Sequence, residues 1–179
     1  TEAEWEYACR AGTTTTYSFG DDPAKLVEYA WFADNSEFTD SGLFTYNEVA
    51  QKKPNPWGLY DMHGNVGEWT IDAFEANSIK TLRDGVAGPW HIPTKRYPRV
   101  IRGGSANDDA EALKSSARMA SSPELKSQDP QIPKSVWYHT DGQHLGLRVI
   151  RPVDIPSAEE MHLFWNTDAR TDELNKEDL

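Results

Sequence analysis

Apolar residues at helical spacing mark the start of the chain as its clearest helix. They follow one another at spacings of three and four and therefore share one face: Trp5, Ala8 and Cys9. Thr1 and Glu4 form a capping box ahead of that face, and Gly12 suits the position just after a helix end. The pattern predicts a helix from Thr1 to Ala11. We expect Cys9 to be a small buried side chain, with a redox or nucleophilic role as the alternative.

Short apolar runs, separated by turn residues, make up the rest of the chain. Arg99 to Arg102 alternates and stops at a Gly-Gly pair, which predicts a strand. Leu145 to Ile150 predicts a closing strand, and Val66 to Ile71 is another short run. Lys25 to Phe32 predicts a short helix, and residues 110–118 predict either a short helix or a strand. Gly, Pro, Asn and Asp recur between these runs and predict a molecule with much loop.

The composition suits one domain and limits its partners. The chain has 179 residues, with seven Trp, seven Tyr and six Phe, so we expect a core built more from aromatic side chains than from Leu and Val. Its net charge of −11 argues against a nucleic-acid partner and against an anionic membrane surface. No apolar stretch is long enough to span a membrane, and the single cysteine excludes a disulfide within the chain.

The run of fifteen residues from Asn55 to Trp69 is the strongest candidate for chemistry. It holds three Gly, two Trp, two Asn, one Asp and one Glu, a mixture that suits neither a helix nor a strand. The glycines allow backbone turns that other residues cannot make. Carboxylate and amide oxygens are the ligands that hard cations prefer. The run therefore predicts a loop that wraps a cation, calcium above all.

Four blocks of sequence together resemble the formylglycine-generating enzyme family, also called sulfatase-modifying factors. The blocks occur in the family's order and at similar spacing, and they are Thr1 to Ala8, Gly58 to Trp69, Arg102 to Ser105, and Gly146 to Arg148. The resemblance implies a loop-rich α+β fold related to C-type lectins, with little regular secondary structure. In the family the first block lies well inside the domain, so the chain resembles the C-terminal part of such a domain.

The resemblance breaks at the residues that carry the family's oxidase chemistry. Active members oxidise a cysteine of a sulfatase to formylglycine, using two cysteines that bind copper as thiolates shortly after the Gly-Gly-Ser block. Those positions fall on Asp108 and Leu113 here, while Ser105 matches the family serine and Cys9 matches neither position. Gly67 stands where the family usually has a Trp beside the active site. These departures imply that no copper site forms and that formylglycine is not generated.

The resemblance also favours calcium in the Gly-rich loop. The family's calcium ligands map onto the side chains of Asp61 and Glu68 and onto the carbonyl groups of Gly64 and Val66. We therefore expect a structural calcium ion that cross-links the loop and contributes to folding stability. The alternative is that Asp61 and Glu68 accept hydrogen bonds from loop amides without an ion.

Two further groups of side chains leave their chemistry open. Asp108, Asp109 and Glu111 could form a hard-metal site or an acid–base pair, or they could be solvated charges on a loop. His139 and His144 could bind a metal, but a pair without a third ligand at a known spacing is a weak signal. Surface or hydrogen-bonded histidines are the alternative.

We divide the chain into a domain over residues 1–152, which the resemblance covers, and an acidic C-terminal extension over residues 153–179. Residues 154–179 hold eight acidic and two basic residues, a net charge of −6. Their apolar patch includes Phe164 and Trp165, which could dock on a neighbour. A partly disordered tail is the alternative.

The leading hypothesis is a non-catalytic binding or scaffold module, because the structural loop is kept while the copper-binding cysteines are lost. A protein or peptide is the expected partner, and the N-terminal part of the same domain, bound as another chain, is one candidate. The alternatives are an enzyme of another chemistry on the same fold and a structural subunit of a larger assembly. We favour a bacterial periplasmic or secreted location over a cytoplasmic one.

Overall fold

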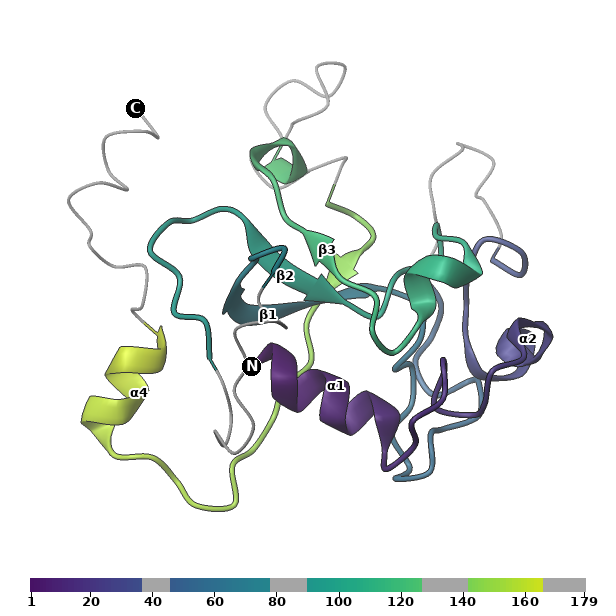
Figure 1. Cartoon of the computed structure of the whole chain (residues 1–179), viewed down its shortest axis with the longest axis horizontal. Helices are drawn as coiled ribbons and strands as arrows, with labels where there is room; N and C mark the ends of the chain where they lie inside the picture. Colours follow the sequence, from purple (N-terminus) through teal and green to yellow (C-terminus); the bar gives the residue numbers. More distant parts are fainter. Residues whose placement is uncertain (37–45, 78–89, 127–141, 166–179) are drawn as a thin grey trace.

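The computed structural model describes residues 1–36, 46–77, 90–126 and 142–165, except for the side chains of 163–165. A small sheet lies at the centre of the molecule, helix α1 (Glu2–Arg10) runs along it, and loops make up much of the rest (Figure 1). The other elements are short, with η denoting a 3-10 helix, and in chain order they are η1 (Pro23–Lys25), α2 (Leu26–Tyr29), β1 (Gly67–Ala73), β2 (Arg99–Arg102), η2 (Ala110–Leu113), β3 (Met119–Ala120), η3 (Pro123–Lys126), β4 (Leu145–Gly146) and α4 (Ala158–Trp165). The predicted loop-rich α+β fold is confirmed.

The strands form one sheet in the order β3-β2-β1-β4. β1 and β2 are antiparallel, with Glu68 opposite Arg102, and β2 is the strand predicted from the alternating run. β4 is parallel to β1 and pairs with it through Leu145 and Gly146. The strand predicted over residues 145–150 is therefore wrong beyond Gly146. The apolar residues that follow have no described neighbouring strand to cover them and are exposed: Leu147, Val149 and Ile150.

Helix α1 begins as its sequence predicts. The Thr1 hydroxyl accepts a hydrogen bond from the backbone N–H of Glu4, and the Glu4 carboxylate accepts from the Thr1 ammonium and hydroxyl groups. Trp5 and Cys9 are buried on the apolar face, as expected. The helix ends at Arg10, one residue before the predicted end, because Ala11 adopts a left-handed conformation with φ of 48° and terminates the ladder.

A buried guanidinium joins α1 to the sheet. Arg102 is fully buried at the end of β2, and its Nη2 donates to the Glu6 carboxylate and, at 2.9 Å, to the Ser115 carbonyl. Its Nη1 donates to the Ala117 carbonyl and lies 3.7 Å from the Glu2 carboxylate. Helix, strand and the 115–117 segment therefore meet at one side chain.

Two clusters of buried side chains form the described core. The larger contains Tyr17, Leu26, Ala30, Phe32 and Leu113, with Phe19 packed against it. The smaller contains Trp5, Cys9 and Met62. The expectation of an aromatic core holds in part, because rings fill both clusters, whereas Trp57 and Trp69 are 48% and 38% exposed.

The C-terminal segment leaves the body of the domain, and α4 lies apart from the sheet (Figure 1). The stretch before α4 exposes between 69% and 99% of five apolar side chains: Leu147, Val149, Ile150, Val153 and Ile155. Residues 166–179 of the predicted acidic extension lie outside the described residues, as do the side chains of Phe164 and Trp165. Within the described ranges, no helix combines the length and apolar character needed to cross a membrane.

Candidate functional site

The Gly-rich loop is anchored to helix α1 by the side-chain amide of Asn55. Its Nδ2 donates to the carbonyl oxygens of Ala8 at 2.7 Å and Cys9 at 3.1 Å, at the end of the helix. Its Oδ1 accepts two loop N–H groups, each at 3.0 Å. One buried amide thus satisfies orphan carbonyls of the helix and shapes the start of the loop.

Asp61, one of the expected calcium ligands, has a carboxylate oxygen without a hydrogen-bond partner among the described residues. Its Oδ2 accepts the Ala50 N–H at 2.8 Å, whereas its Oδ1 is buried without a hydrogen-bond partner among the described residues. A buried carboxylate oxygen without a donor is costly unless a cation or a water reaches it. Gly64 and Val66 follow in the same loop, and the Val66 side chain lies against Gly146. The position of Asp61 therefore fits a cation.

Glu68, by contrast, is paired with an arginine. The side chain is 6% exposed, and its Oε2 accepts from Trp5 Nε1 at 2.7 Å. Arg148 binds both carboxylate oxygens, with Nε at 2.9 Å and Nη2 at 2.7 Å. Arg148 Nη2 also donates to the loop carbonyls of Tyr60 at 2.9 Å and Asp61 at 3.3 Å. A guanidinium thus supplies positive charge to this loop, and an ion at Glu68 would have to displace it.

The family's two cysteine positions serve the fold in this chain. Asp108 Oδ2 accepts from the N–H of Ser105 at 2.8 Å and from its hydroxyl at 2.6 Å, which closes the turn after the Gly-Gly-Ser block. Leu113 is fully buried in the larger core cluster. Its carbonyl oxygen lies 2.7 Å from His63 Nδ1.

The other candidate groups do not assemble a metal site in the described part of the chain. Asp109 and Glu111 are exposed, whereas the Asp108 carboxylate is bound by Ser105. His139 lies outside the described residues, so the His139–His144 pair stays a prediction. Within the described ranges, no three His, Cys, Asp or Glu side chains come together in a way suited to a metal.

A buried cluster around His63 is not predicted by the sequence. Because His63 Nδ1 faces the Leu113 carbonyl, the proton lies on Nδ1 and Nε2 is the acceptor. Nε2 accepts the Ser18 N–H at 3.2 Å, and it lies 2.9 Å from the Ser18 hydroxyl and 3.8 Å from Cys9 Sγ. Burial lowers the pKa of His63 to about 4 and raises the pKa of Cys9 to about 12. The cluster is therefore a neutral hydrogen-bonded support, with no thiolate nucleophile.

We expect acid to destabilise the protein through His63. Its pKa falls from 6.5 to about 4 on folding, so the folded state resists a proton that the unfolded state accepts. The stabilisation is present above pH 6.5 and is lost as the pH falls towards 4, on the order of 3 kcal/mol in all. Urea unfolding at about pH 7 and about pH 4.5 should show a smaller acid loss for His63→Asn than for wild type.

His162→Asn, at an exposed position in α4, is the matched control and should retain the wild-type loss. Carboxylates that titrate in the same range contribute equally to wild type and variants, so the difference isolates His63. An acid loss in His63→Asn equal to that of wild type would contradict the prediction.

A cavity of about 180 Å³ opens beside Asp108, one of the two positions at which the family has a cysteine. It is lined by residues from three strands and the loops around them: Gly67, Ile101, Gly103, Gly104, Asp108, Ala112, Ala117, Arg118, Met119 and His144. Two of the departures from the family pattern, Gly67 and Asp108, thus border one cavity. A side chain at Gly67 would meet Ile101 at 3.0 Å and Leu145 at 3.1 Å, so neighbouring side chains already fill the direction in which it would point.

The fold and the sequence blocks define a class, the sulfatase-modifying-factor domains. The family model described as the sulfatase-modifying factor enzyme 1-like domain matches residues 1–130, and this chain belongs to that family. The formylglycine-generating enzyme of Mycobacterium tuberculosis is 33% identical over 114 residues, which are 59% of this chain and 38% of that protein. The solved structure of Treponema denticola variable protein 1 is 38% identical, with a TM-score of 0.55, over 69% of this chain and 41% of that chain.

A further relative carries a name that bears on activity. The inactive C-alpha-formylglycine-generating enzyme 2 of mouse is 27% identical over 136 residues, which are 71% of this chain and 39% of that protein. The chain spans 38–41% of the length of the relatives named here. Family membership is confirmed, and the single cysteine is consistent with the loss of the catalytic pair.

Proposed function

We propose that the chain is a non-catalytic binding or scaffold module on the sulfatase-modifying-factor fold. The observation that supports this most is the use of both family cysteine positions for the fold, with Asp108 closing the turn at Ser105 and Leu113 filling the core. The one thiol, Cys9, matches neither family position, and burial raises its pKa to about 12, so it is protonated at neutral pH.

A turnover assay tests this proposal directly. The chain is incubated with a sulfatase-derived cysteine peptide, copper and oxygen, and the peptide mass is followed. We expect no formylglycine, whereas the formylglycine-generating enzyme of Mycobacterium tuberculosis serves as the positive control in the same mixture. Product formation by this chain above a copper-only blank would overturn the proposal.

We propose a protein or peptide as the partner, and the N-terminal part of a family domain as the first candidate. The support is the stretch from Leu147 to Ile155, in which five apolar side chains are exposed. A run of exposed apolar side chains of this kind is typical of a surface that a partner covers. A separately produced N-terminal part of a related domain should form a complex with the chain in size-exclusion chromatography with light scattering. Val149→Asp should weaken that complex, and a complex unaffected by it would exclude this surface.

We also propose a structural calcium ion in the Gly-rich loop, held by the side chains of Asp61 and Glu68 and the carbonyls of Gly64 and Val66. The support is the buried Asp61 Oδ1, which has no partner among the described residues. Glu68 has to exchange Arg148 for the ion, so the salt bridge between them opposes binding. An ion bound in the folded state alone would stabilise the fold by mass action.

Calcium should therefore raise the unfolding temperature relative to EDTA, and magnesium should not replace it because it demands a tighter octahedral site. Arg148→Gln frees the Glu68 carboxylate and should enlarge the calcium-dependent shift, while Asp61→Ala should abolish it. At 100-fold excess over the Kd, the stabilisation is about 2.7 kcal/mol. Identical unfolding temperatures in calcium and EDTA, for both wild type and Arg148→Gln, would count against the ion.

A further inference from the structure

The cavity beside Asp108 has a wall that is mainly apolar and a volume of about 180 Å³. The apolar part of the wall comes from Ile101, Ala112, Ala117 and Met119. Cavities of roughly 150 Å³ with apolar walls hold a molecule the size of benzene. The cavity therefore has room for one small ligand or for one side chain of a larger partner.

Two of the described side chains on this wall carry a full charge, Arg118 and Asp108, and they differ in their ionic partners. Arg118 is paired with Glu2, whose carboxylate oxygens lie 2.5 Å from its Nε and 2.8 Å from its Nη2, and Glu2 also lies 3.7 Å from Arg102. Asp108 accepts hydrogen bonds from the neutral N–H and hydroxyl of Ser105, and it forms no ion pair with a described residue. Among the described lining residues, Asp108 is therefore the charged side chain that has no ionic partner.

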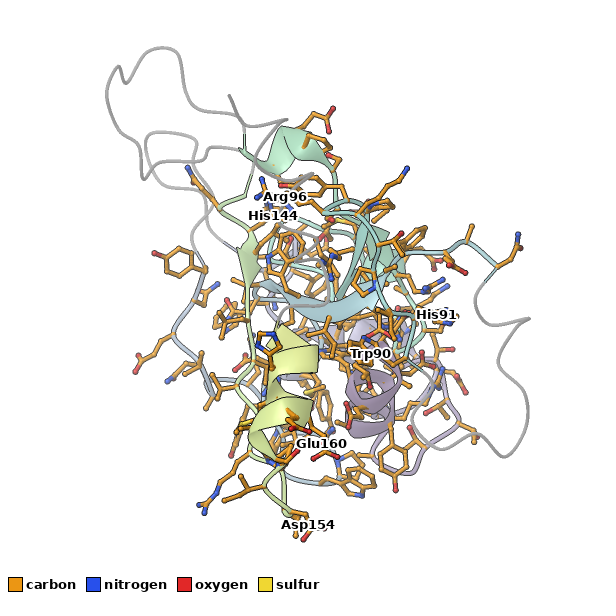
Figure 2. All side chains as sticks on the ribbon, turned by 90° about the vertical axis from the view of Figure 1, so that its left-hand side faces the viewer. Trp90, His91, Arg96, His144, Asp154 and Glu160 are labelled. Carbon is orange, nitrogen blue, oxygen red and sulfur yellow. The ribbon has the colours of Figure 1, made fainter. Side chains whose placement is uncertain are left out.

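The charge of the cavity is separate from that of the acidic C-terminal segment. His144 lines the cavity, and it lies far from Asp154 and Glu160, which are at the opposite end of the molecule (Figure 2). The residues around α4 therefore do not supply counter-charge or extra negative charge to this wall. A ligand in the cavity would be selected by Asp108 and the apolar side chains around it.

We propose that this cavity binds a linear alkylammonium group, the chemistry of a lysine side chain. The methylene stem packs against Ile101 and Met119, and the ammonium group donates to the Asp108 carboxylate. Charge-assisted hydrogen bonds gain strength in an apolar wall, where water screens less. The net charge of −11 also attracts a cation to the molecule. This inference rests on the proposed binding module and names the chemistry of its ligand.

Amide NMR titration of the full chain with n-butylamine, and with 1-butanol as its uncharged counterpart, tests the proposal. Butylamine should shift the signals of residues around Asp108 and bind about tenfold more tightly than butanol, because one charge-assisted hydrogen bond separates the two ligands. A third titration uses N-acetyl-lysine N-methylamide. Binding by this compound identifies a peptide side chain as the ligand, and binding by butylamine alone identifies a free small amine.

Matched variants locate the site. Asp108→Asn removes the charge but keeps an oxygen for the Ser105 donors, and it should weaken butylamine about tenfold without affecting butanol. Asp109→Asn, at the exposed neighbour, should leave butylamine binding unchanged. Ala112→Leu should block both ligands by filling the cavity, with circular dichroism confirming that it folds.

Equal binding of butylamine and butanol would overturn the proposal, as would absence of binding by the amine or equal loss in the two Asp variants. These outcomes leave the binding module intact, because the turnover assay decides that question independently. Formylglycine formation together with selective amine binding would have the opposite meaning: the site chemistry would stand and the non-catalytic function would fall.

Discussion

Gly64→Ala is expected to lower the free energy of unfolding by on the order of 3–5 kcal/mol. Gly64 has φ of +76°, a region that costs an L-residue energy, and a Cβ there would lie 2.1 Å from the Trp31 carbonyl oxygen. Backbone cannot move aside as a side chain can, because Trp31 and Gly64 form a bridge at this point and the Trp31 carbonyl accepts the Asn65 N–H at 2.8 Å. Urea unfolding followed by tryptophan fluorescence measures the effect.

Gly58→Ala is the matched control for this prediction. Gly58 has nearly the same backbone angle, φ of +79°, but a Cβ there would meet no atom within 4 Å. Gly58→Ala should therefore lower the free energy of unfolding only by the cost of placing an L-residue at positive φ, about 1–2 kcal/mol. If the two variants lose the same free energy, the close approach of Trp31 to Gly64 is not what holds the loop in place.

Local signals in the sequence predicted the local structure well. The capping box of Thr1 and Glu4 depends on residues three apart, so helix α1 follows from the sequence alone. Strand β2 follows from alternation that a Gly-Gly pair terminates. The strand predicted over residues 145–150 is wrong beyond Gly146 because a strand also needs a neighbouring strand to pair with. Residues 147–150 have strand-like composition, but composition does not show whether such a neighbour exists.

The candidate site depends on contacts that no local pattern encodes. Glu68 and Arg148 are 80 residues apart, and the sequence marked both without indicating that they pair. His63 lies within the predicted loop, yet its partners Ser18 and Leu113 come from segments 45 and 50 residues away. Family resemblance located the former cysteine positions, whereas the cavity beside Asp108 appears only when strands and loops are assembled.

Arg102→Met is expected to cost about 3–5 kcal/mol of unfolding free energy. The thioether side chain fills much of the volume but donates no hydrogen bonds, so the carbonyls of Ser115 and Ala117 lose the donors that Arg102 provides. Burial lowers the pKa of Arg102, and Glu6 and Glu2 oppose the shift, because removing the guanidinium from water disfavours its charged form. The measurement is the same urea titration, with far-UV circular dichroism to detect loss of α1.

Arg10→Met is the matched control, because Arg10 binds the same Glu6 carboxylate through Nε at 2.8 Å. That pair is partly exposed, with side-chain exposures of 27% and 31%, so its loss should cost no more than about 1 kcal/mol. Glu6 keeps one arginine in either variant, and Arg10 also donates to the Thr15 carbonyl at 3.0 Å. A difference between the variants therefore measures burial, the second carbonyl contact of Arg102 and its contact with Glu2. If Arg102→Met is neutral or stabilising, the cost of desolvating the guanidinium equals or exceeds the stabilisation from its hydrogen bonds and ion pairs. Apolar packing, and not Arg102, would then hold α1 to the sheet.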